Sequence, residues 1–393
     1  MLNKNLVILS LSQIFSFTAA PITVFLSGII GSQISPIKSL STLPMSISVV
    51  GIAVGAIFAT KLMSLIGRKA GFIFASLGNS LVSILAAYSI MEQNFILFCI
   101  ANFFLGVGMA FTHQYRFAAA ESVEKDKIPK AISIILLGGI ISAFVGPGIA
   151  NYSKDIVSDQ LYVGSYISLS ILTIIPMIFF LFYENISKLK TEIKYSGRSY
   201  LELISQPKFL QAMVASAFGY AIMTFLMTAT PLSMHVMEKM SLDKTSMVIQ
   251  FHVASMFLPS LLTGHLIKKI GHSLVMYAGI FLYSITILIS FFDQTYMNYL
   301  FALISLGLGW NFLFISGTSL LVLTYKEEEK FKAQGFNDFI VYSIHAIGSL
   351  SAGVLIVHTN WKLMNIMCIP LLIIIILTII RADIHNKKTI NIN

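Results

Sequence analysis

The stretch Phe95–Ala120, FILFCIANFFLGVGMAFTHQYRFAAA, decides the fold class of this chain. It contains a single charged side chain, Arg116. A helix needs about 20 consecutive apolar residues to cross the hydrocarbon core of a bilayer. Backbone groups that face lipid must find hydrogen bonds within the segment, which a helix provides. We therefore expect a membrane-spanning helix here.

Eleven other stretches share this apolar character. They are residues 6–31, 43–60, 70–90, 131–150, 161–183, 209–234, 246–267, 273–292, 296–324, 336–357 and 363–380. The runs are too long and too uniformly apolar for barrel strands. The whole chain of 393 residues is 56% hydrophobic and 11% charged, whereas soluble domains are about 25% charged. The sequence thus predicts an all-α integral membrane protein of twelve spans and excludes a water-soluble enzyme.

Basic residues indicate the orientation. With the N-terminus inside, 21 of the 26 lysines and arginines fall on inner segments, and five fall on outer segments. Those five are Lys38, Lys154, Lys239, Lys244 and Lys362. Because cytoplasmic loops carry the excess of Lys and Arg, we expect a cell (inner) membrane protein with both termini in the cytoplasm. This topology accounts for the net charge of +9 without a nucleic-acid partner.

A duplication is visible at a nearly fixed offset. The longest polar stretch, 184–208, predicts a cytoplasmic linker between one six-helix bundle at 1–183 and another at 209–393. Matching positions include Gly106, Gly108 and Phe111 with Gly307, Gly309 and Phe312, Ile66 and Gly67 with Ile270 and Gly271, and Lys130 and Ala131 with Lys332 and Ala333. Recurrence in register predicts two structural repeats. Two parallel six-helix repeats are found in one large class of secondary transporters.

In architecture and in several motifs the chain resembles the major facilitator superfamily over nearly its whole length. The family's loop motif after the second span survives as Gly67, Arg68 and Lys69, with Thr60 in place of its first glycine and Ser64 in place of its aspartate. The second copy of this motif keeps Gly264, Lys269 and Gly271, and Gly146 with Pro147 matches part of an antiporter signature. The resemblance implies that these positions belong to the conformational machinery.

A narrower resemblance concerns two short strings. Residues Tyr115–Ala118 and the set Gly335, Asn337 and Asp338 are similar to a branch containing riboflavin and related small-metabolite carriers. The resemblance also implies that the first, fourth, seventh and tenth spans line a central cavity. It nominates these residues for substrate contact: Gln13, Tyr220, Thr224, Trp310 and Asn311. Further candidates for substrate contact are His113 on a polar face of the fourth span, and Asn337 and Tyr342 in the run 336–357.

The run 336–357 carries the clearest polar face. Asp338, Tyr342, His345 and Ser349 are spaced 4, 3 and 4 residues apart, so they line one side of a helix. An ionisable group in hydrocarbon is costly and is usually functional. A carboxyl, a phenol and an imidazole in line suit proton exchange with an aqueous cavity. The alternative is structural, with Asp338 as a charge near the cytoplasmic end and His345 bonded to a neighbouring helix.

Arg116 and Asp338 are expected at similar depth near the inner end of their spans, where they could pair when an inner gate is shut. Alternatively, Arg116 extends to lipid headgroups. His252 is a further candidate for proton coupling. Trp310 and Asn311 offer a stacking face beside an amide, which suits a planar, partly polar solute, although an amide near glycines can equally join helices.

Other chemistries lack support in the sequence. There is no phosphate-binding loop, no metal-spaced set of Cys and His, and no nucleophile elbow, so we expect no metal and no cofactor. The acidic run Glu327–Glu329 is expected to be solvated loop charge. The favoured function is a monomeric secondary active transporter that moves a small organic solute through the bilayer by alternating access, coupled to protons as symporter or antiporter. The alternatives are proton-antiport efflux of drugs or siderophore-like metabolites, and a multispan receptor that does not transport.

Overall fold

A computed structural model describes residues 3–37, 40, 43–157, 160–186 and 197–390. Within these ranges every regular element is a helix, as the sequence predicts. The first seven α-helices are α1 Lys4–Ser16, α2 Ala19–Ile34, α3 Leu43–Met91, α4 Phe95–His113, α5 Tyr115–Glu121, α6 Ile128–Ser153 and α7 Val163–Leu181. The others are α8 Tyr200–Ser205, α9 Pro207–Pro231, α10 Leu242–Phe257, α11 Ser260–Ile270, α12 His272–Ile289, α13 Tyr296–Val322, α14 Lys330–His358, α15 Trp361–Ile366 and α16 Ile369–Ile390.

Ten helical segments in the described part of the chain are long and apolar enough to cross a membrane. One of them, α3, is 49 residues long and contains two predicted spans, because its helical path is interrupted only at Gly67. The predicted span 336–357 lies within α14, which is not one of the ten.

Prolines explain three interruptions in the predicted spans. The run 6–31 is divided into α1 and α2 before Pro21, the run 246–267 into α10 and α11 at Pro259, and the run 363–380 into α15 and α16 before Pro370. A proline lacks the N–H for a helical hydrogen bond, and its ring crowds the carbonyl four residues earlier. The three prolines are visible in the sequence, but each apolar run is long enough to be predicted as a single span.

The helices form two compact units. The first comprises Met1–Glu124, Ile134–Tyr195 and Gln334–Tyr342, and the second comprises Lys125–Ser133, Ser196–Ala333 and Ser343–Asn393. The segment 125–133 lies in the predicted N-terminal bundle but packs with the second unit. The segment 334–342 lies in the predicted C-terminal bundle but packs with the first unit. The bundle limits at 183 and 209 stay a prediction.

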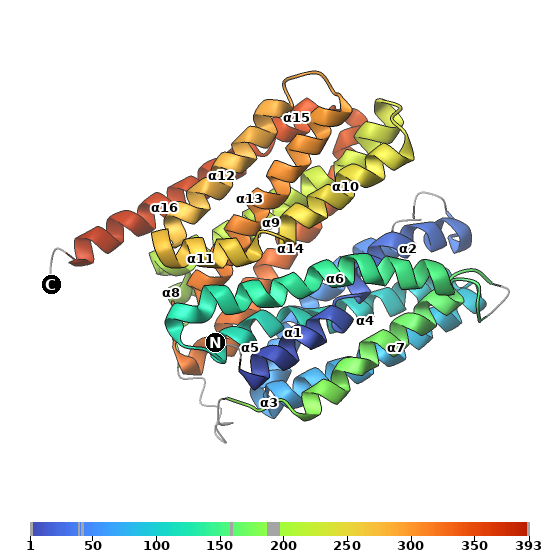
Figure 1. Cartoon of the computed structure of the whole chain (residues 1–393), viewed down its shortest axis with the longest axis horizontal. Helices are drawn as coiled ribbons and strands as arrows, with labels where there is room; N and C mark the ends of the chain where they lie inside the picture. The colour runs from blue at the N-terminus through green and yellow to red at the C-terminus, as the bar shows by residue number, and fades with distance from the viewer. Residues whose placement is uncertain (1–2, 38–39, 41–42, 158–159, 187–196, 391–393) are drawn as a thin grey trace. The chain divides into compact units, whose positions relative to one another are not determined.

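In each unit one long helix packs against several others. In the first unit, α3 runs along α4 and α7, and α1 packs on α7 (Figure 1). The rings of Phe72 and Tyr115 lie 4.8 Å apart between centroids, and those of Phe72 and Phe180 lie 5.0 Å apart. In the second unit, α13 is packed against α9, α10 and α12, while α16 covers α9.

Equivalent glycines adopt the same backbone conformation in the two units. Gly67 and Gly271 share one unusual backbone conformation, with φ of 84° in both and ψ of 165° and 166°. A positive φ of this kind is readily adopted only by glycine. The two residues are 204 positions apart, so the duplicated motif keeps the same turn between consecutive helices.

The close helix contacts are duplicated as well. Gly106 of α4 lies against Ser48 and Gly51 of α3, and Gly307 of α13 lies against His252 and Ser255 of α10. The contacted residues are again 204 positions apart, pairwise. Gly108 facing Asn79 and Gly309 facing Tyr283 repeat the relation. The sequence recurrence thus reflects two copies of one packing scheme.

Substitution of Gly106 tests this packing. A Cβ atom there would collide with the backbone carbonyl of Ser48, so Gly106→Ala should lower stability by about 1–3 kcal/mol, as overpacking usually does. The measurement is the thermal midpoint of the purified protein in detergent. Gly78→Ala is the matched control on α3, because a Cβ atom there would meet nothing within 4 Å and alanine favours a helix. Equal midpoints for the two variants would contradict the close contact.

Candidate functional site

The first unit contains a buried charge cluster centred on Asp338. The carboxylate of Asp338 on α14 forms an ion pair with the guanidinium of Arg116 on α5, and the two side chains are 1% and 3% exposed. The amide of Gln114 donates to Oδ2 of Asp338 at 3.0 Å, and the amide of Asn337 donates to Oδ1 at 3.0 Å. The structure therefore brings together two of the residues that the sequence proposes for proton coupling or gating.

A break between two helices positions this cluster. α4 ends at His113 and α5 begins at Tyr115, with the fully buried Gln114 between them. The ring of His113 stacks on Tyr342 with centroids 4.6 Å apart. Arg116 donates to the hydroxyl of Tyr342 at 3.4 Å. Asp338 on one turn of α14 therefore contacts Gln114 and Arg116. Tyr342 on the next turn contacts His113 and Arg116.

Loss of either partner of the Arg116–Asp338 ion pair would be costly. Removal of one partner from a buried ion pair typically costs about 3–5 kcal/mol, because an uncompensated charge stays buried. Protonation of Asp338 would have a related effect, since it removes the negative charge that faces Arg116.

Arg68 of the loop motif has an acidic partner that the sequence analysis missed. Its Nε donates to Glu121 at 2.8 Å, and its terminal nitrogen donates to the side-chain carbonyl of Gln334 at 2.7 Å. Glu121 at the end of α5 thus provides a carboxylate for this motif, in which Ser64 stands where the family has an aspartate. Beside it, the backbone N–H of Lys69 donates to the side chain of Asn185 at 3.0 Å.

The departures from the family's glycines are compensated at their contacts. Thr60 lies against Gly335 in the first unit, and Ser133 lies against Gly264 in the second. Thr60 and Gly264 are equivalent positions in the duplicated motif, 204 residues apart. In each contact one partner is a glycine and the other carries a hydroxyl, so the helices can still approach closely.

The remaining motif residues have different surroundings. Gly146 packs near Pro21, where an added Cβ atom would lie 3.3 Å from the proline ring. Pro147 lies in α6, but its side chain is outside the described part of the structure. Lys269 is exposed, and Gly271 ends α11.

The second unit contains an aromatic cluster with two of the proposed substrate residues. Trp310 stacks on Phe314 with ring centroids 4.8 Å apart and an interplanar angle of 13°. Tyr220 of α9 contacts Trp310 edge-on at 5.4 Å, and the ring of His345 lies 4.5 Å from that of Tyr220. The sequence nominated Trp310, Tyr220 and His345 separately, and the fold gathers them.

Other nominated residues make contacts typical of helix packing. The amide of Asn311 donates to the carbonyl of Met256 and to Ser260, and Thr263 donates to its oxygen. Asn311 thus joins α13 to α10 and α11, as the packing alternative predicts. His252 is buried, with Nδ1 2.7 Å from the carbonyl oxygen of Leu303.

Two further polar residues nominated for substrate contact are also buried. Gln13 lies on α1 near Gly138, and Thr224 lies on α9. Thr224 lies one helical turn after Tyr220 on α9, whereas Gln13 lies in the first unit.

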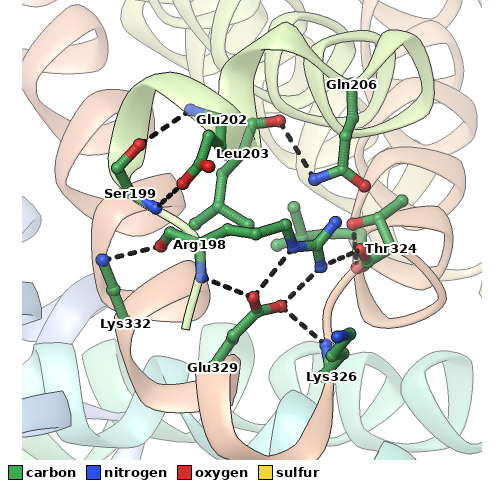
Figure 2. Close-up of polar contacts among 10 residues, drawn as sticks. Arg198, Ser199, Glu202, Leu203, Gln206, Thr324, Lys326, Glu329 and Lys332 are labelled. Atoms are coloured by element: carbon green, nitrogen blue, oxygen red, sulfur yellow. Dashed lines mark hydrogen bonds and ion pairs between the residues drawn. The ribbon is translucent and has the colours of Figure 1, made fainter. Parts of the chain in front are cut away.

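The expectation of solvated charge at Glu327–Glu329 is wrong for Glu329. Glu327 and Glu328 are exposed, but the Glu329 side chain is 1% exposed and forms an ion pair with Arg198. Figure 2 shows Arg198 reaching the carboxylate from the chain just before α8, while the backbone N–H of Lys326 approaches from the other side. The sequence could not single out one glutamate of three, because the difference lies in which one turns inward.

This Arg198–Glu329 clamp is well satisfied. Nε of Arg198 donates to Glu329 at 2.8 Å, and its backbone N–H donates at 2.9 Å. Lys332 at the start of α14 donates to the carbonyl of Arg198 at 2.7 Å. The hydrogen bonds from Arg198 hold the pKa of Glu329 at about 2, below its ordinary value of 4.5. The clamp therefore fastens the end of the predicted linker to the segment that leads into α14.

The sequence profile of the Major Facilitator Superfamily matches residues 6–272 and 239–391. The riboflavin transporter RfnT of Brucella anthropi is 32% identical over 379 residues, which cover 96% of this chain and 95% of that protein. The chain belongs to the Major Facilitator Superfamily.

Two crystal structures show the same fold. A bacterial homologue of the iron transporter ferroportin in an outward-facing state matches with a TM-score of 0.74 at 12% identity, covering 97% of this chain and 100% of that one. The transporter FucP in an outward conformation matches with a TM-score of 0.71 at 16% identity, covering 95% and 98%. These likenesses confirm the predicted twelve-span fold. The family profile and the riboflavin transporter relative confirm a multi-pass membrane transporter of a small molecule, not an enzyme.

Neutralisation of Glu329 tests the clamp. Because the folded protein lowers the pKa of Glu329 from 4.5 to about 2, the ionised carboxylate stabilises the fold at pH values above about 4.5 and loses this effect as the pH falls towards 2. Glu329→Gln should therefore lower the free energy of unfolding at pH 7 by about 1–3 kcal/mol. Thermal midpoints in detergent measure the change, with the exposed Glu328→Gln as the matched control. A midpoint for Glu329→Gln equal to that of the control would contradict the clamp.

Proposed function

We propose that this chain is a secondary active transporter of riboflavin, or of a flavin closely similar to it, in the cell membrane. The observation that carries this proposal is the 32% identity to a riboflavin transporter over 96% of this chain and 95% of that protein. The identical residues are spread over nearly the whole length of both chains. This favours a shared substrate class more strongly than a match confined to one motif would. The cluster of aromatic rings in the second unit is consistent with a planar substrate.

The transport cycle is proposed to use alternating access coupled to protons. Asp338 is the proton-binding group in this scheme, because its carboxylate is buried and its charge is balanced by Arg116. Protonation would weaken the hold on Arg116 and free the α5 segment from α14. Tyr342 and His113 continue the contact along α14 and would separate with it.

Arg68 is proposed to report on the same movement. It contacts Glu121 on α5 and Gln334 on α14, so it touches both segments that carry the Arg116–Asp338 pair. A change in that pair would alter the position of Arg68 as well. The protein is proposed to work as a monomer with both termini in the cytoplasm, which follows from the distribution of Lys and Arg.

Asp338→Asn tests the coupling. The amide keeps the size of the carboxyl group but cannot exchange a proton at neutral pH, so riboflavin accumulation driven by an imposed pH gradient should be lost. Proteoliposomes that contain the purified protein measure this accumulation. Exchange of internal for external riboflavin without a gradient should remain detectable, because it needs no net proton movement. Asp293→Asn, at an exposed position between α12 and α13, is the control and should accumulate riboflavin normally.

The outcomes separate the alternatives. Gradient-driven accumulation by Asp338→Asn at the control level would refute the assignment of Asp338. Saturable riboflavin binding without flux in the unmodified protein would instead support a receptor. Accumulation only when the gradient is reversed would indicate export.

A further inference from the structure

An indole N–H in the second unit is buried without a hydrogen-bond partner. Trp310 is 2% exposed, and its Nε1 has no acceptor among the residues that the structure describes. A buried donor without an acceptor is costly, and in native proteins such a group usually has an explanation. A ligand that brings an acceptor to this position would satisfy it.

The surroundings of Trp310 indicate the kind of ligand. One face of the indole stacks on Phe314, and Tyr220 and Phe257 meet it edge-on with centroids at 5.4 and 5.8 Å. None of these side chains carries a fixed charge. Such a set can hold a flat ring by stacking and by contact with ring edges.

Two rings at this cluster are less buried than Trp310. Tyr220 and His345 are only partly buried, and their rings lie 4.5 Å apart at an angle of 31°. A flat ligand could take the place of one of these rings against the other, with the buried Trp310 and Phe314 behind it. Entry then requires Tyr220 or His345 to turn aside.

We propose that the tricyclic ring of the flavin binds at this aromatic cluster, defined by Tyr220, Phe257, Trp310, Phe314 and His345, and accepts a hydrogen bond from the indole N–H of Trp310. The proposal rests on the proposed function and names the part of the substrate that the second unit recognises. The carbonyl oxygens and ring nitrogens of a flavin are suitable acceptors, whereas its ribityl chain offers no stacking face.

The location has a consequence for coupling. His345 lies seven residues, about two helical turns, after Asp338 on one face of α14. A ring that displaces His345 therefore acts on the same helix that carries the proposed proton site. Binding of the substrate and binding of the proton would then both act on α14, which is the physical requirement for coupled binding.

Flavin fluorescence in the full-length purified protein tests the proposal, because emission of the ring falls when it stacks on an aromatic side chain. Trp310→Phe keeps an aromatic ring and removes only the N–H donor and one fused ring, so the Kd for riboflavin should rise about tenfold. Trp361→Phe makes the same chemical change at the other tryptophan, which packs against Tyr299, and should leave the Kd unchanged. Lumichrome, the tricyclic ring without the ribityl chain, should compete with riboflavin, and ribitol should not.

A second measurement does not depend on the folding of Trp310→Phe. In the Trp361→Phe protein, Trp310 is the one remaining tryptophan of the sequence, and lumichrome should quench its emission with the same half-saturation as it shows in competition. Equal Kd values for the two variants, unquenched Trp310 emission, or competition by ribitol alone would overturn the ring site while riboflavin transport stands. Failure of the unmodified protein to bind or carry riboflavin would instead refute the proposed substrate.

Discussion

A carboxylate buried on a membrane helix must be matched by a cation and by donors, and this requirement organises the first unit. Asp338 on α14 is satisfied by Arg116, Gln114 and Asn337. Gln114 and Arg116 contact Asp338 from the α4–α5 segment, and Asn337 contacts it from α14 itself. The break at Gln114 follows the same requirement, because it places Gln114 and Arg116 on the same carboxylate.

The duplication explains how this demanding arrangement coexists with close helix packing. Gly106 and Gly307 allow their helices to approach equivalent neighbours in the two units. Where one repeat has lost a glycine, as at Thr60, its contact partner Gly335 supplies the space. Ser133 and Gly264 show the reverse assignment. The two repeats thus preserve the separation of the helices rather than the identity of each residue, which is why the sequence match between them is sparse.

The all-helical fold was largely predictable from sequence, because apolar length is a property of single segments. The similar depth of Arg116 and Asp338 followed from the same reasoning. Glu121 and Gln334 were missed because their role depends on contact with Arg68, which is distant in sequence. Asn311 had the polarity expected of a substrate ligand, but its three hydrogen-bond partners on neighbouring helices become apparent only in the fold.

The polar and aromatic features of α14 belong to one mechanical element. Its N-terminal end is fastened through Lys332 to the Arg198–Glu329 clamp, and its next turns carry Asp338, Tyr342 and His345. These positions share one hydrogen-bonded backbone, because α14 is a single helix of 29 residues. Neutralisation of Asp338, displacement of His345 or release of the clamp would therefore act on the same helix. This shared dependence would give the proposed coupling a physical basis that needs no direct contact between the proton and the solute.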